Sequence, residues 1–163
     1  MKTKKIIAIA LFAICLPLQM QAQQIYNEVT RMQKMFLASK QDKSKSLDER
    51  KIASFKWDAI EYMLYKAKDD TTFTEKALGE QTYAMTDFVN LFVKRLSEAG
   101  KDKSKREIVF QRFKNASINN SLFNDMDKDL VLAYYNSEKF ITQFSLDTNW
   151  VKALAEIRSK SWE

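Results

Sequence analysis

Turn-forming residues are almost absent from this chain, and their scarcity limits its possible folds more than any other feature. The 163 residues include 2 Gly and 1 Pro, whereas 45% are hydrophobic. An all-β sandwich needs Gly and Pro at its many tight turns, and a phosphate-binding loop needs glycines. We therefore expect neither. The hydrophobic content is ample for the core of one domain.

Apolar residues recur at three- and four-residue spacing along most of the chain, which is typical of amphipathic helices. The spacing predicts an all-α fold, a compact bundle of five or six helices. Thr72-x-x-Glu75 and Ser104-x-x-Glu107 are expected to be capping boxes at the starts of the third and fourth helices. Gly100 is expected to end the third helix. The expected helices cover about 24–40, 48–67, 72–99, 104–116, 127–136 and 148–158.

The stretch from 130 to 145 leaves an alternative open. L-V-L-A-Y-Y and K-F-I-T-Q-F-S are rich in β-branched and aromatic residues, with N-S-E between them. A small β-hairpin packed on the helices competes there with the fifth helix. The tetrapeptide D-K-S-K occurs at 42–45 and again at 102–105. Because the apolar stripes that follow do not align without a gap, we interpret this repeat as coincidence.

The first 22 residues have the layout of a signal peptide. Three lysines precede an apolar run over 6–16, and Pro17 and Ala22 follow it. The run is too short for the roughly 20 residues of a membrane span. Bulky Ile14 precedes Cys15, so we interpret Cys15 as an apolar filler and not as a lipidated cysteine. The predicted organisation is a cleaved signal peptide over 1–22 and a single helical domain over 23–163, secreted or periplasmic.

Cleavage also changes the charge of the chain. Removing three lysines lowers the basic residues from 27 to 24 against 21 acidic residues, so the net charge falls from +6 to +3. A surplus this small does not indicate a nucleic-acid partner. We expect no nucleic acid and no retained membrane span. The sequence leaves the oligomeric state open.

The side-chain inventory excludes several kinds of chemistry. The chain contains no His, and its one Cys lies in the expected signal peptide. Catalytic triads, thiol nucleophiles, ordinary zinc sites, haem ligation and iron–sulfur clusters all need these residues. The acidic run D-M-D-K-D at 125–129 has the spacing that opens a calcium loop. It lacks the Gly and Glu of that loop, and we interpret it as an acidic helix start. We expect no cofactor and no metal.

Carboxylates alone could still support a polysaccharide hydrolase, which needs one carboxyl group that is protonated and one that is ionised. Many carboxylates fall on the polar faces of the expected helices, where a side chain is solvated and keeps its ordinary pKa. The residues in question are Asp58, Glu61, Asp87 and Glu98. We therefore expect that the protein is not an enzyme.

Aromatic residues are the enriched class with functional meaning, at 12% of the chain. Most Phe lie on apolar stripes, whereas several Trp and Tyr do not. The candidate ligand-binding residues are Trp57, Tyr62, Tyr65 and Trp150. Such rings can stack on sugars or anchor a protein partner, although a central helix that buries more than one face would place them in the core. The segment 144–150 fits either a recognition site or a helix cap.

Together these features favour an exported, non-enzymatic binding protein with an aromatic-rich surface. Its expected partner is a protein or a glycan of the cell envelope or its surroundings. Two alternatives stay open: a carboxylate-dependent polysaccharide hydrolase and a structural subunit of an envelope complex.

Overall fold

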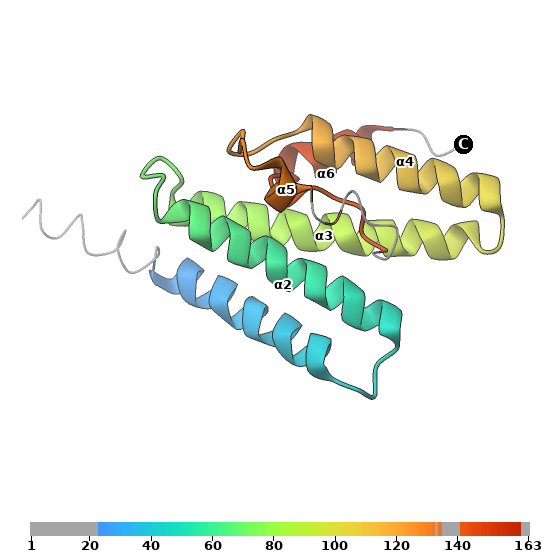
Figure 1. Cartoon of the computed structure of the whole chain (residues 1–163), viewed down its shortest axis with the longest axis horizontal. Coiled ribbons are helices and arrows are strands. Elements are labelled where there is room, and N and C mark those ends of the chain that lie inside the picture. Colours follow the sequence, from blue (N-terminus) through green and yellow to red (C-terminus); the bar gives the residue numbers. More distant parts are fainter. Residues whose placement is uncertain (1–22, 133, 135–140, 161–163) are drawn as a thin grey trace, which may run out of the picture.

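A computed structural model describes residues 23–132, 134 and 141–160, and every regular element in this part of the chain is a helix. The predicted all-α bundle is confirmed. Its expected signal peptide lies outside the described residues. The helices, shown in Figure 1, are a first helix over residues 23–41, α2 (Leu47–Ala67), α3 (Glu75–Ala99), α4 (Lys103–Asn119), the short α5 (Lys128–Val131) and α6 (Trp150–Ser159).

Helix α3 is the centre of the bundle. It packs against α2 on one side and against α4 and α6 on the other (Figure 1). The first helix lies along α2 and also reaches α3, where the Tyr83 hydroxyl donates a hydrogen bond to Glu28 over 2.8 Å. Helix α3 can bury so much of its surface because its stripe of large apolar residues is wide. The fully buried members of this stripe are Met85, Phe88, Val89 and Phe92.

An edge-to-face cluster of aromatic rings fills the space between the helices. The ring of Phe88 lies 5.2 Å from Phe144 and 5.5 Å from Trp150, centroid to centroid. Phe55 of α2 meets the same two rings at 5.6 and 5.8 Å. These T-shaped contacts set the positive edge of one ring against the negative face of the next. Trp150 is fully buried by this cluster.

The helix starts differ from the predicted ones by a few residues. The capping box predicted at Thr72 is wrong, because the N-cap of α3 is Thr74. The backbone N–H and hydroxyl of Thr72 instead donate to Asp70, at 2.9 and 2.6 Å. Asp102 caps α4, so the box predicted at Ser104 is also wrong. Helix α2 begins with a capping box between Ser46 and Glu49 that the sequence analysis missed. The predicted end of α3 is confirmed, with Gly100 at a φ of 56°.

The C-terminal part departs furthest from expectation. Of the predicted fifth helix over 127–136, α5 covers Lys128–Val131, Leu132 and Tyr134 lie outside it, and the other positions after 132 lie outside the described residues. Helix α4 runs on to Asn119. The described residues of the 130–145 segment contain no strand, and the rest of the competing hairpin lies outside the described residues. The two D-K-S-K copies differ in role. The first copy forms a turn in which the Ser44 hydroxyl donates to Asp42. The second copy begins with Asp102, which is the N-cap of α4.

Buried polar groups hold the non-helical segment 141–149 in place. The Asp147 carboxylate accepts from the Ser121 hydroxyl at 2.5 Å and from the backbone N–H groups of Phe123 and Asp125 at 2.7 and 2.9 Å. A fourth bond comes from the N–H of Leu122 at 3.2 Å. Asp147 is not the cap of α6, whose N-cap is Asn149. It fastens the loop after α4 to the segment before α6.

The start of α6 depends on α3. The side-chain oxygen of Gln81 accepts a hydrogen bond from the backbone N–H of Trp150 at 2.6 Å. The side-chain NH₂ of Gln81 donates to the Asn149 side chain at 3.0 Å. Asn149 is the N-cap and accepts from the N–H of Lys152. Buried N–H groups at a helix start need such partners. The segment 144–150 therefore works as a helix entry, one of its two predicted roles.

Gly79 brings the first helix close to α3. A Cβ placed on this glycine would lie 2.8 Å from Cγ2 of Ile25, closer than carbon atoms pack. Glycine in a helix interior costs about 1 kcal/mol relative to alanine. The contact explains why glycine stands at this position despite the cost, because a larger residue at 79 would push the first helix away from α3.

The first prediction tests this close approach. Gly79→Ala is expected to lower the free energy of unfolding, by about 1 kcal/mol, because the clash outweighs the gain in helix propensity. In an Ile25→Ala background the same change is expected to raise it by up to about 1 kcal/mol. Urea denaturation of the four proteins measures this cycle. Stabilisation by Gly79→Ala in both backgrounds would contradict the contact.

The second prediction concerns Asp147. Asp147→Asn is expected to cost about 2–4 kcal/mol of stability, because the amide turns a donor toward groups that also donate. Asp129→Asn is the matched control, since Asp129 is exposed on α5. That change is expected to stay within about 0.5 kcal/mol. Thermal and urea unfolding measure both, and equal effects would show that Asp147 has no special role.

Candidate functional site

A groove of about 660 Å³ lies at one end of the bundle. Four segments build it: the first helix, the C-terminal half of α2, the loop that leads into α3, and the first turn of α3. Tyr26, Thr30 and Gln33 come from one face of the first helix, and Glu61 and Tyr65 come from α2. We call this cavity the tyrosine groove.

The two tyrosines give the groove its exposed aromatic surface. The side chain of Tyr26 is 44% exposed and that of Tyr65 is 56% exposed, although both are large and apolar in the ring. Tyr26 lies on the first helix and Tyr65 on α2, so two helices each contribute one aromatic ring to the groove. Phe73 completes the aromatic lining from the loop before α3.

An inner layer of rings supports Phe73. Its ring lies 4.9 Å from Phe123, which in turn lies 6.0 Å from Tyr62. The backbone of Phe123 is itself held by Asp147, at 2.7 Å. The loop wall of the groove therefore rests on the buried polar network of the C-terminal part. A groove built on a rigid support loses less entropy when it binds.

Tyr62 belongs to this inner layer. It is buried, and its hydroxyl donates to Oδ2 of Asp125 over 2.9 Å. Burial and this hydrogen bond raise the pKa of Tyr62. The backbone N–H of Asp127, the Tyr62 hydroxyl and the ammonium of Lys66 at 3.2 Å together lower the pKa of Asp125. Tyr62 thus positions the loop and does not face the groove.

The four residues singled out from the sequence are not brought together. Tyr65 lines the groove, Tyr62 lies beneath it, and Trp150 is enclosed in the core. Trp57 is half-buried, and the ammonium of Lys40 lies 4.7 Å above its ring. Sequence reasoning missed Tyr26. Its signal was the four-and-three spacing of Tyr26, Thr30 and Gln33, which places them on one helix face.

The charged lining of the groove is mainly acidic. Glu61, Asp70 and Glu75 face it together with the cation of Lys68. The amide of Gln33 donates to Glu61 over 2.6 Å and holds this carboxylate at the groove wall. Hydrogen bonds from the Thr72 hydroxyl and backbone N–H lower the pKa of Asp70. The groove therefore carries an excess of negative charge on a chain with a net positive charge.

Asp58 corrects one expectation about the carboxylates. It was expected on a solvated face, but it is half-buried and accepts a hydrogen bond from the Tyr134 hydroxyl. Burial raises the pKa of Asp58, and Lys40 at 4.0 Å partly opposes this. Asp58 is not among the residues that line the groove. Glu61, Asp87 and Glu98 are exposed, as predicted.

A second cavity, of about 310 Å³, lies between the first helix, α2 and α3. Lys56 is buried against it, with 6% of the residue exposed. Its Nζ donates to the Asn90 side chain over 2.7 Å and lies 5.3 Å from the ring of Phe36. Burial lowers the pKa of Lys56 to about 8, and the charge of Asp87 partly opposes this.

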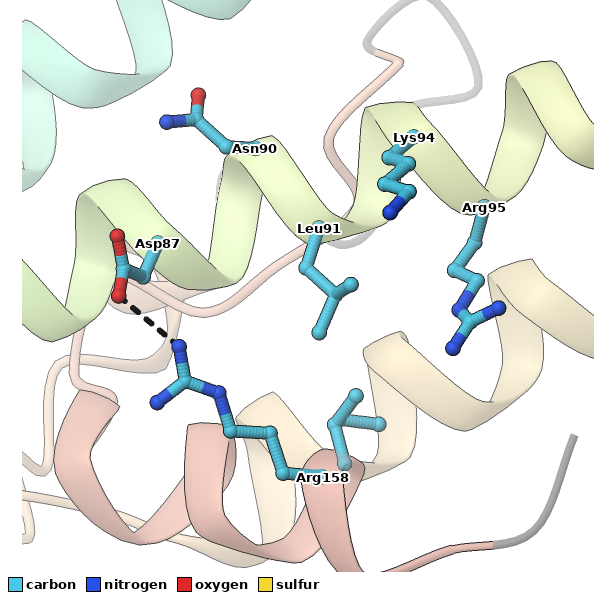
Figure 2. A pocket seen from close by; sticks show the side chains of 7 residues that line it. Asp87, Asn90, Leu91, Lys94, Arg95 and Arg158 are labelled. Atoms are coloured by element: carbon cyan, nitrogen blue, oxygen red, sulfur yellow. Dashed lines mark hydrogen bonds and ion pairs between the residues drawn. The ribbon is translucent and has the colours of Figure 1, made fainter.

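A third cavity, of about 390 Å³, separates α3 from α6 (Figure 2). Asp87 and Arg158 close one end with an ion pair of 3.0 Å, and Lys94 and Arg95 stand at the other end, with Leu91 between. Arg95 also pairs with Glu98 at 2.9 Å. The cations of this cavity thus already have carboxylate partners.

Comparison with known proteins adds no family assignment. No protein-family model, curated protein or solved structure matches the chain. Within the described ranges, no group of three or more Asp or Glu side chains is placed to hold a metal ion. No helix in the same part of the chain is long and apolar enough to cross a membrane.

The third prediction follows from Lys56. Its folded pKa of about 8 lies below the ordinary value of 10.5, so between these values the unfolded chain holds a proton that the folded chain has released. The stability of the native protein should therefore rise from about pH 8 to 10, relative to a Lys56→Met variant, by about 2–3 kcal/mol. Below pH 8 the difference should be constant. Urea titrations at each pH measure it, and parallel curves for both proteins would contradict the burial of the charge.

Proposed function

We propose that this chain is an exported binding protein that holds a glycan segment in the tyrosine groove. One observation carries the proposal: Tyr26 and Tyr65, from two different helices, are both about half exposed in one groove of about 660 Å³. Tyrosine combines a flat apolar face with a polar tip, which suits a sugar ring with one apolar face and hydroxyl edges. Large exposed rings gathered in a concavity are more informative than scattered ones.

The polar lining also suits a glycan. Sugar hydroxyl groups donate and accept hydrogen bonds, and the groove offers carboxylate, amide and hydroxyl side chains at Glu61, Gln33 and Thr71. Concave ligand sites usually combine an apolar lining with a few such polar groups. Export is supported by the lysines, the apolar run and the Pro and Ala of the first 22 residues.

Several observations favour binding over hydrolysis. A hydrolase that works with carboxylates alone needs one carboxyl group with a raised pKa at the site. The groove carboxylate whose pKa is shifted is Asp70, and its pKa is lowered. The carboxyl group with a raised pKa, Asp58, is not part of the groove lining. The absence of His from the sequence removes the commonest general base.

A basic peptide is the second candidate ligand. Three carboxylates and one lysine line the groove, so its lining charge is negative. A Lys or Arg side chain could place its cation over a tyrosine face and near these carboxylates. This candidate keeps the binding function and changes the class of partner.

The fourth prediction tests the groove. Tyr26→Ala and Tyr65→Ala are each expected to weaken binding of residues 23–163 to its ligand by about 1–2 kcal/mol, a five- to thirtyfold loss of affinity, because a stacking surface is removed. Immobilised panels of envelope polysaccharide fragments and of Lys/Arg-rich peptides measure binding. The matched control is Ile108→Ala, because Ile108 is 50% exposed on α4 and lies outside the groove.

The outcomes separate the candidates. Binding to polysaccharide that Tyr65→Ala weakens and Ile108→Ala does not would support the glycan. The same pattern on peptides would support the second candidate. Release of shorter sugars from a bound polysaccharide would favour the hydrolase. No binding in either panel, or equal losses in all three variants, would overturn the groove as a binding site. A structural subunit of an envelope complex would then be the alternative to pursue.

A further inference from the structure

The ammonium group of Lys56 has no ion-pair partner in the described part of the chain. Its described hydrogen-bond partner is the neutral side chain of Asn90, at 2.7 Å, and none of the ion pairs of the described residues includes it. A lysine ammonium carries three N–H donors. The charge of Asp87 acts on Lys56, but no carboxylate lies within ion-pair distance of it in this part of the chain. A buried charge without a direct counter-charge is costly, and proteins usually pair it.

Apolar side chains from three helices line the cavity beside Lys56. Phe36 of the first helix, Ile52 of α2 and Val93 of α3 supply these side chains around a volume of about 310 Å³. Val93 is partly exposed, with 37% of its surface accessible, which leaves the cavity open to small molecules. The cavity therefore joins one cationic group to a short apolar surface.

The other charged groups of this cavity are already engaged. The carboxylate of Glu49 accepts from the Ser46 backbone N–H and hydroxyl, at 2.9 and 2.7 Å, in the capping box of α2. The ammonium of Lys45 donates to Ser39 over 2.7 Å. With Lys45, Lys56 and Glu49 in its lining, the cavity carries more positive than negative charge. An anion is therefore the ligand that its charge favours.

The cavity between α3 and α6 shows the contrast. Its Arg158 and Arg95 already pair with Asp87 and Glu98. Asn90 lines both cavities, and Figure 2 shows its amide pointing away from Leu91 and Arg158. The amide oxygen is the one that accepts from Lys56. Asn90 thus holds the lysine at the cavity without neutralising it.

We propose that this cavity binds a small aliphatic carboxylate. The carboxylate accepts hydrogen bonds from the two remaining donors of Lys56, and the alkyl tail lies against Phe36, Ile52 and Val93. A carboxylate with an alkyl tail fits better than inorganic phosphate, because phosphate gains nothing from the apolar side chains of Phe36, Ile52 and Val93. The site is separate from the tyrosine groove, since no residue lines both.

The fifth prediction uses hexanoate as the probe. Calorimetry at pH 7 with residues 23–163 is expected to show saturable, one-to-one binding of hexanoate in the millimolar range. Hexanol, hexylamine and inorganic phosphate are each expected to bind at least about tenfold more weakly, because each lacks either the negative charge or the tail. Phosphate that binds as tightly as hexanoate would overturn the apolar part of the site.

Two variants probe the two halves of the site. Lys56→Met is expected to weaken hexanoate binding by at least about tenfold, through loss of the ammonium. Val93→Trp is expected to do the same by filling the cavity while Lys56 stays in place. The matched control is Val151→Trp, because Val151 is similarly exposed, at 43%, but lies on α6. Circular dichroism and thermal unfolding show whether each variant is folded.

The proposal fails if hexanoate shows no saturable binding up to about 10 mM, a free energy of binding weaker than about 3 kcal/mol. It also fails if folded Val93→Trp binds hexanoate as tightly as the native chain. This second test holds even if Lys56→Met does not fold. Tyr65→Ala is expected to leave hexanoate binding unchanged, so a failure here leaves the glycan proposal standing and the reverse also holds.

Discussion

The close approach of the first helix to α3 at Gly79 is the contact on which both proposed sites depend. The first helix supplies Tyr26 and its neighbours to the tyrosine groove and supplies Phe36 to the cavity at Lys56. The glycine removes the Cβ that would meet Ile25 at 2.8 Å. Close packing in protein interiors transmits small displacements to neighbouring groups. A shift of this one helix would therefore open both concavities together.

The fold follows from the sequence to a large extent, because the helices of this chain rest on apolar stripes that a single sequence displays. The end of α3 at Gly100 is a local signal, as is the spacing of Met85, Phe88 and Phe92. The helix starts are harder to predict, since several Ser, Thr, Asp and Asn residues stand near each start and compete for the cap. Thr72 satisfies every local rule for a cap, yet its hydroxyl is taken by Asp70.

The candidate sites are less predictable, because exposure depends on which faces of a helix have neighbours. Helix α2 has neighbours on two sides, so Tyr62 and Lys56 are buried while Tyr65 is exposed. Trp150 follows its N-cap in a polar segment, and only the tertiary fold shows that α2 and α3 enclose its ring. The groove itself joins residues from 26 to 78, and no spacing rule relates such distant positions.

The hydrogen bond from Trp150 to Gln81 spans 69 positions in the sequence. A helix as short as α6 is marginally stable in isolation, because the conformational entropy lost in ordering its first turn is offset by few hydrogen bonds. Here the acceptor for that first turn is supplied by a side chain from the centre of the bundle. The start of the last helix is therefore fixed by Gln81, a residue of α3 that is synthesised 69 positions earlier. A chain truncated before residue 150 would leave the Gln81 side chain without this partner, at the place where α6 packs in the intact chain.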